Sequence, residues 1–123
     1  AVLESAIRSI IDKTTQAFCH LDMHQAMKIE PLEQVIDDLV REVKSRHVRR
    51  LRDGLCTVEY GFVLEDILTA YERSADHCSN VAVAIIETEH NAYDIHNYLH
   101  GVKHGNEAFD KSYEAYTAKY QLA

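Results

Sequence analysis

Two pairs of carboxylates with the same spacing are the residues of this 123-residue sequence best suited to chemistry. Glu33 and Asp37 form one Glu-x-x-x-Asp pair, and Glu72 and Asp76 form the other. On a helix, residues four apart lie one turn apart on the same side, where like charges destabilise each other. A cation or a basic side chain shared between them removes that repulsion. Each pair is therefore a candidate half of a metal site, and pairing with arginine is the alternative.

A basic cluster lies between residues 41 and 52, which hold six of the thirteen Lys and Arg residues. One interpretation is a contact with an anion, a phosphate or an acidic lipid headgroup. The alternative is structural, because cations near the C-terminal end of a helix complement its dipole. The candidates for the contact are Arg46, Arg49, Arg50 and Arg52.

Histidines provide further candidates for metal binding. Glu87-x-x-His90 matches half of a di-iron carboxylate motif, but the sequence holds no second Glu-x-x-His. Other histidines recur at a spacing of four, which permits chelation, although exposed polar positions are the simpler explanation. These are His20 with His24, and the series His96, His100 and His104.

Composition predicts one all-α domain. Hydrophobic residues make up 46% and charged residues 27%, while Pro (1) and Gly (4) are too scarce for the turns of a many-stranded sheet. Three cysteines without C-x-x-C spacing fit neither a disulfide framework nor a thiolate zinc site, which favours a reducing cytoplasm. No apolar stretch is long enough for a membrane span, so we expect a soluble chain, and its start without Met suggests a larger parent.

The net charge of −7 is unevenly distributed along the chain. Residues 1 to 52 carry nine basic against eight acidic side chains, whereas residues 53 to 123 carry four against twelve. Nucleic-acid binding requires a basic face. This acidic half therefore argues against it.

Apolar residues recur at spacings of three and four, which predicts three long antiparallel helices over residues 2–28, 31–52 and 57–90. Pro31 favours a helix start, Gly54 a helix end, and Thr57 an N-cap. His47 falls on an apolar stripe and is interpreted as a core residue. Both carboxylate pairs flank their apolar stripes, so we expect them on facing edges of neighbouring helices, partly open to solvent.

A shorter helix is predicted at the C-terminus, where four aromatic residues form one stripe: Phe109, Tyr113, Tyr116 and Tyr120. We expect the stripe to cover the bundle or a second copy, since exposing that much aromatic area is unfavourable. The expected organisation is a three-helix bundle over residues 1–92, with a linker and C-terminal helix over residues 93–123 packing on it.

The stretch from Tyr71 to Ala82 (YERSADHCSNVA), the two Glu-x-x-x-Asp pairs and the helix end Arg49-Arg50-Leu51-x-x-Gly54 resemble the PhoU family. The similarity extends over nearly the whole chain. It is greatest to the PhoU-like cytoplasmic domain at the C-terminus of bacterial sodium/phosphate cotransporter family proteins. The sequence differs from PhoU itself in having one bundle where that protein has two in tandem.

The resemblance implies a three-helix bundle whose Glu-x-x-x-Asp carboxylates bind metal ions at the surface. The ligands would be Glu33, Asp37, Glu72 and Asp76, and the metal iron, zinc, manganese or magnesium, of which oxygen ligands suit the hard cations best. The implied function is a non-catalytic regulatory domain of a phosphate transport system at the inner face of the membrane. Its partners would be the transmembrane part of the transporter or other components of the system, with self-association left open. The alternatives are a di-metal carboxylate enzyme and a metal-free interaction module.

Overall fold

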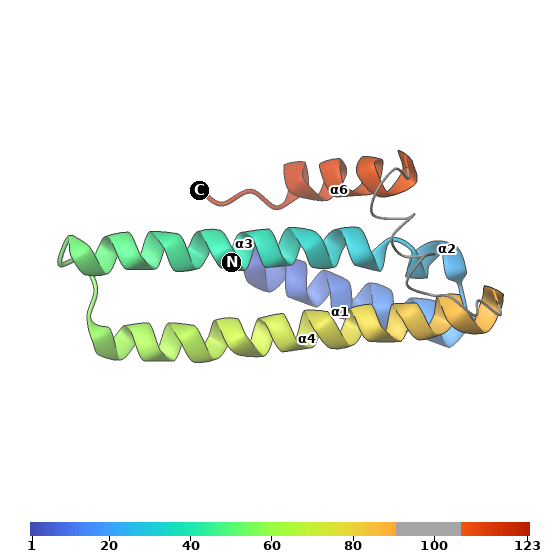
Figure 1. Cartoon of the computed structure of the whole chain (residues 1–123), viewed down its shortest axis with the longest axis horizontal. Coiled ribbons are helices and arrows are strands. Elements are labelled where there is room, and N and C mark those ends of the chain that lie inside the picture. The colour runs from blue at the N-terminus through green and yellow to red at the C-terminus, as the bar shows by residue number, and fades with distance from the viewer. Residues whose placement is uncertain (91–106) are drawn as a thin grey trace.

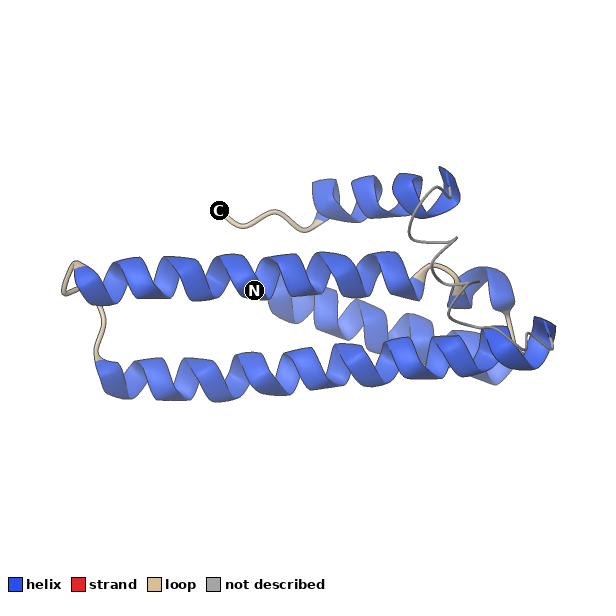
Figure 2. Ribbon diagram, viewed as in Figure 1, coloured by secondary structure: helices blue, strands red, loops and turns tan. Residues whose placement is uncertain are grey.

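In a computed structural model of the chain, every element in the described residues is a helix (Figures 1 and 2). The structure describes residues 1–90 and 107–123, except for the side chains of residues 89 and 90. The elements are α1 (Val2–His20), α2 (Met23–Ala26), α3 (Ile29–Arg52), α4 (Val58–His90) and α6 (Glu107–Lys119). The predicted all-α class is confirmed, and α1, α3 and α4 form a helical bundle.

The first helix ends earlier than predicted. Instead of continuing to residue 28, α1 stops at His20, because Leu21 takes a left-handed conformation with φ 46°. Asp22 then starts the short helix α2, and its side chain accepts a hydrogen bond from the backbone N–H of Gln25. An aspartate N-cap stabilises a helix start. The apolar period continued across this break, which is why periodicity alone did not reveal it.

The turn between α3 and α4 has the helix end and the N-cap that the sequence predicted. Gly54 has φ 71°, a left-handed conformation that glycine adopts without strain, and it ends α3. Thr57 caps α4, since its hydroxyl accepts a hydrogen bond from the backbone N–H of Tyr60. Near this turn Gly61 faces His47, and a Cβ at Gly61 would lie 2.7 Å from His47 Nε2. A side chain at Gly61 would therefore require the His47 ring to move.

The core lies between α1, α3 and α4, and each helix contributes part of the apolar stripe predicted from its sequence. Ile10 of α1, Ile36 of α3 and Ala75 of α4 are completely buried within it. Helices α3 and α4 run antiparallel, so that Glu30 lies beside Ser79 and Lys44 lies beside Glu72. Burial of this apolar area is the main driving force for the bundle.

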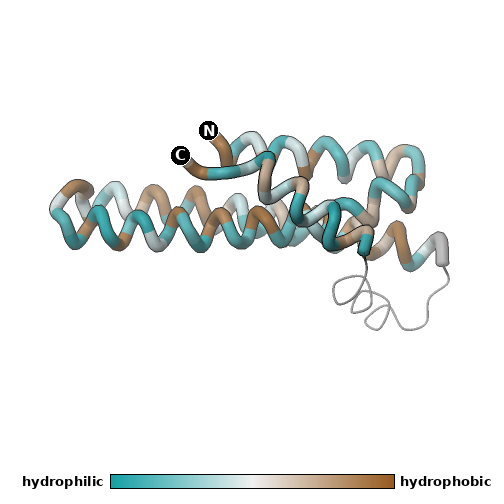
Figure 3. Tube along the Cα trace, turned by 90° about the horizontal axis from the view of Figure 1, so that it is seen from above, coloured by the Kyte–Doolittle hydropathy of each residue, from teal (hydrophilic) through white to brown (hydrophobic). Residues whose placement is uncertain are grey.

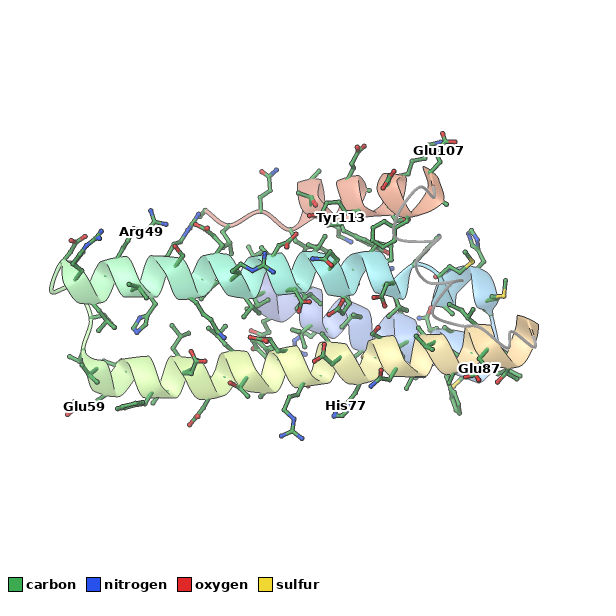
Figure 4. The ribbon with its side chains drawn as sticks, viewed as in Figure 1. Arg49, Glu59, His77, Glu87, Glu107 and Tyr113 are labelled. Atoms are coloured by element: carbon green, nitrogen blue, oxygen red, sulfur yellow. The ribbon has the colours of Figure 1, made fainter. Side chains whose placement is uncertain are left out.

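Helix α6 packs on α3 through the aromatic stripe expected at the C-terminus. Phe109 and Tyr120 are buried, and the rings of Phe109 and Tyr113 stack with their centroids 6.2 Å apart. The Tyr113 hydroxyl donates a hydrogen bond of 2.5 Å to Asp38 Oδ2, and Figure 4 shows Tyr113 between the two helices. The expected domain boundary at residues 92 and 93 lies outside the described residues. In the described part, no helix is both long enough and apolar enough to cross a membrane.

Two isoleucines should differ clearly in how much they contribute to the stability of the bundle. Ile36 is completely buried, whereas Ile11 of α1 is 46% exposed. We expect Ile36→Ala to lower the free energy of unfolding by about 2–5 kcal/mol, because it removes buried atoms and leaves a cavity. Ile11→Ala, the matched control, should change it by no more than about 0.5 kcal/mol. Urea unfolding followed by circular dichroism measures both, and equal losses would contradict this core.

Candidate metal centre

Three carboxylates from two helices meet where the edges of α3 and α4 face each other. Glu33 and Asp37 lie one turn apart on α3, and Asp76 faces them from α4. One oxygen from each of the three side chains lies within 4.8 Å of the others. Both carboxylates of the Glu-x-x-x-Asp pair on α3 therefore belong to the cluster. Of the pair on α4, only Asp76 does.

Glu33 is the most deeply placed member of the cluster. Its residue is 7% exposed, although the sequence pattern predicted a position outside the apolar seam. Burial raises the pKa of Glu33 from 4.5 to about 9, with further contributions from its hydrogen bond to Asp37 and from the negative charges of Asp37, Glu30 and Asp76. At neutral pH the metal-free site therefore holds a proton on Glu33. A metal ion that binds to Glu33 would have to displace this proton.

Asp37 lies at an intermediate depth between buried Glu33 and exposed Asp76. Burial is the main cause of its raised pKa, and the hydrogen bond from Glu33 works in the opposite direction. The negative charges of Asp76 and Glu72 raise it further, while Arg41 lowers it. The cluster thus changes from a buried, protonated end at Glu33 to an open end at the exposed Asp76. A cation would enter from the open end.

Glu72, the fourth predicted ligand, is held by a lysine and does not join the cluster. Lys44 Nζ lies 3.1 Å from Glu72 Oε1 and 3.3 Å from Glu65 Oε1. The hydrogen bond to Glu72 is the main cause of the raised pKa of Lys44. One half of the second pair thus follows the salt-bridge alternative, with a lysine in place of the expected arginine.

A surface cavity of about 300 Å³ opens beside the cluster. It is lined by the acidic residues Asp37, Glu72 and Asp76 and by the basic residues Arg41 and Lys44. Carboxylate oxygens with room for water are the usual ligands of hard cations such as Mg²⁺ and Mn²⁺. The residues present thus fit a solvent-accessible cation bound by Glu33, Asp37 and Asp76.

Two partners of the site were missed in the sequence. Lys44 follows Asp37 by seven residues, or two helical turns, and this spacing placed it on the carboxylate edge of α3. The Ser79 hydroxyl donates a hydrogen bond of 2.5 Å to Glu30 Oε2, one turn deeper along the same edge. No sequence signal linked these two residues, because the contact depends on how α3 and α4 are aligned.

The basic cluster forms mainly local ion pairs. Arg46 Nε lies 2.9 Å from Glu42 Oε1, and Arg49 Nη2 lies 3.4 Å from the same atom. Arg46 also donates a hydrogen bond to the backbone oxygen of Ala123, while Arg52 lies 4.0 Å from Asp53. Arg50 makes no ion pair with the described residues and lines an apolar groove. These contacts favour the structural interpretation of Arg46, Arg49 and Arg52.

The histidine candidates do not join the carboxylate cluster in the described part of the chain. The break at Leu21 separates His20 on α1 from His24 on α2, so they are not a pair on one helix. Glu87 is exposed near the end of α4 (Figure 4). His96, His100 and His104, with the side chain of His90, lie outside the described residues.

Together these features define a helical-bundle domain with a carboxylate centre at its surface. A family model for the PhoU domain matches residues 3–85, which is most of the bundle and includes both Glu-x-x-x-Asp pairs. The chain belongs to the PhoU family.

Comparison with curated proteins identifies a relative from Thermotoga maritima, described as the phosphate-specific transport system accessory protein PhoU homolog 1. The two are 27% identical over 101 residues, covering 82% of this chain and 43% of the relative. The chain thus spans less than half the length of that protein. No solved structure matches the chain significantly.

The raised pKa of Glu33 makes the stability of the metal-free protein depend on pH. Between pH 4.5 and about 9 the folded state keeps a proton that the unfolded state has lost, so the free energy of unfolding falls as pH rises. The slope is at most about 1.4 kcal/mol per pH unit for one proton. Glu33→Gln, which mimics the protonated form, should show a weaker dependence.

Urea unfolding in a chelator at pH 5, 7 and 9 measures this difference. Glu59→Gln is the matched control, because Glu59 is exposed at the start of α4 (Figure 4) and should retain the slope of the wild type. Parallel profiles for the wild type and Glu33→Gln would show that Glu33 is ionised in the folded protein.

Proposed function

We propose that this chain is a regulatory, non-catalytic domain of a phosphate transport system and that it binds a metal ion at the α3–α4 edge. Membership of the PhoU family supports the regulatory role. The relative from Thermotoga maritima is described as an accessory protein of a phosphate-specific transport system, which supports the link to phosphate. The cluster of Glu33, Asp37 and Asp76 is the observation that carries the metal site.

The cluster suits a cation that links two helices. Glu33 and Asp37 come from α3 and Asp76 from α4, so an ion bound by all three would connect α3 to α4 and stabilise the folded bundle. Bound metal would supply positive charge among carboxylates that otherwise repel one another. It would also displace the proton of Glu33, so metal affinity should increase with pH. Oxygen ligands favour manganese, magnesium or ferric iron over a closed structural zinc site.

The narrower proposal concerns the parent protein. The resemblance of the Tyr71–Ala82 stretch implies the cytoplasmic part of a sodium-dependent phosphate cotransporter, lying at the inner face of the membrane. In that setting the domain's partner would be the transmembrane part of its own polypeptide or another component of the transport system. Regulation would then consist of the bundle docking on or leaving that partner.

A metal-free interaction module is a second candidate, and the Lys44 ion pairs favour it. Lys44 neutralises Glu72 and Glu65, and the proton on Glu33 removes part of the remaining repulsion. The remaining repulsion is thus small enough for the bundle to fold without a metal ion. The di-metal enzyme gains no comparable support, because Glu87, its distinguishing residue, is exposed near the end of α4.

Metal analysis of two variants separates the two candidates. Asp76 belongs to the cluster, whereas Glu72 is bound by Lys44. We expect Asp76→Asn to lose most of the bound metal and Glu72→Gln to retain most of it, because only the first removes the negative charge of a carboxylate in the cluster. The measurement is metal content by mass spectrometry after refolding with iron, manganese or zinc. Glu87→Gln is the control. Equal metal content in the wild type and Asp76→Asn would place the metal outside this cluster, and none in either would leave the metal-free module.

The transporter context has its own test. If the parent is a sodium-dependent phosphate cotransporter, the reading frame upstream of Ala1 should encode several apolar segments of about 20 residues, each long enough to span a membrane. Deleting the domain from that parent should change how phosphate uptake responds to external phosphate while uptake itself persists. Complete loss of uptake by a correctly inserted parent would instead indicate a direct part in transport.

A further inference from the structure

The polar edges of α3 and α4 extend past the carboxylate cluster. Hydrophilic positions recur between hydrophobic ones along both helices (Figure 3), so each helix keeps a polar edge over several turns. On α3, Lys44 follows Asp37 by seven residues and lies on the same edge. On α4, Glu65 precedes Glu72 by the same interval. The row of carboxylates on α4 therefore continues past the cluster, whereas the row on α3 continues as a lysine.

Lys44 lies between two carboxylates of α4. Its Nζ atom is 3.1 Å from Glu72 Oε1 and 3.3 Å from Glu65 Oε1, and it donates a hydrogen bond to each of them. A lysine ammonium carries one positive charge and three donors. Without it the two glutamates would face each other as unpaired negative charges. Lys44 thus has the same electrostatic role for Glu65 and Glu72 that a metal ion has between two carboxylate ligands.

This ion pair adjoins the metal centre. Lys44 and Glu72 line the same cavity of about 300 Å³ as Asp37 and Asp76. The negative charge of Glu72 acts on the cluster, since it contributes to the raised pKa of Asp37. Glu72 also lies one helical turn from Asp76. The two carboxylates of the α4 pair therefore share one site, but Asp76 faces other carboxylates and Glu72 faces a lysine.

The side chains around Lys44 have room to rearrange. Those of Lys44, Glu65 and Glu72 are 40%, 56% and 37% exposed. Carboxylate oxygens bind hard cations at about 2.0–2.6 Å, so the two glutamates would have to close on an ion by roughly 1 Å compared with their distances to Nζ. Partly exposed glutamates can make that change by rotating their side chains. An ion could therefore replace the ammonium without moving the helices.

We propose that Lys44 is a built-in cation that occupies the position of a second metal ion and so limits the α3–α4 edge to a single bound metal. The inference rests on the metal-binding function proposed above. With the ammonium removed, the ligands of the second ion would be Glu65 and Glu72, completed by water. Carboxylates and water are the usual ligands of hard cations such as Mn²⁺. Lys44 thus determines how many ions the edge accepts.

Arg41, the other basic residue of the cavity, is held differently. In the described part of the chain its ion pair is with Asp38 of its own helix, at 3.6 Å between Nη1 and Oδ1. Asp38 in turn accepts the hydrogen bond of Tyr113 from α6. Arg41 therefore adds positive charge to the cavity without lying between two carboxylates of α4. The two residues allow a matched comparison, because they contribute the same charge to the same cavity.

The test counts the Mn²⁺ ions that the full chain and its variants bind. Lys44→Ala vacates the position between the glutamates, and Arg41→Ala removes the same charge beside it. We expect the wild type and Arg41→Ala to bind one Mn²⁺ ion and Lys44→Ala to bind a second. Equilibrium dialysis followed by mass spectrometry of the metal gives the number of bound ions. Thermal unfolding in a chelator confirms that each variant is folded.

Two further variants assign the second ion to its ligands. Adding Glu72→Gln to Lys44→Ala should abolish the second ion and keep the first, because the first is bound by Glu33, Asp37 and Asp76. Lys44→Arg keeps the positive charge and should bind one ion, like the wild type.

The outcomes separate this inference from the proposed metal centre. If the wild type and Lys44→Ala both bind one ion, the inference is wrong while the centre stands. If the wild type binds none and Lys44→Ala binds one that Glu72→Gln removes, the inference stands and the centre fails. If neither binds an ion, both fail. A second ion in Arg41→Ala as well would show a general effect of charge, and the role given to Lys44 would be wrong.

Discussion

The antiparallel packing of α3 against α4 is the constraint on which both the bundle and its site depend. Apolar stripes on the two helices fix their distance and rotation, while the alignment along their length determines which polar groups meet at the edge. Glu30 meets Ser79, Asp76 meets the pair of Glu33 and Asp37, and Lys44 meets Glu72. A shift by one turn would separate these partners, although every helix would keep its own pattern.

The carboxylate edge shows how burial and charge compete in a small bundle. Placing Glu33 next to the core is unfavourable for its ionised form, and the protein responds by retaining a proton there. Farther out, where water screens charge, Glu72 and Glu65 form ion pairs with Lys44. This arrangement makes the stability of the bundle depend on pH.

The buried residues of the bundle lie where α1 packs on α3 and α4. Helix α6 covers another face of α3 through its aromatic stripe. Between Val40 and Leu68 the α3–α4 hairpin contains no buried residue. In the described residues the core therefore lies at one end of the hairpin, and most of the exposed large apolar side chains lie at the other.

The sequence by itself determined the helices and the spacing of the candidate ligands, because both depend on contacts within one or two turns. The helical period of the apolar residues, together with Gly54 and Thr57, predicted the bounds of α3 and α4 closely. The break at Leu21 escaped notice, since the apolar period continued through it. Only the tertiary structure decided that Glu33 is buried, that Asp76 joins it and that Lys44 pairs with Glu72. Those outcomes depend on the alignment of two helices far apart in sequence, which the pattern of either helix alone cannot specify.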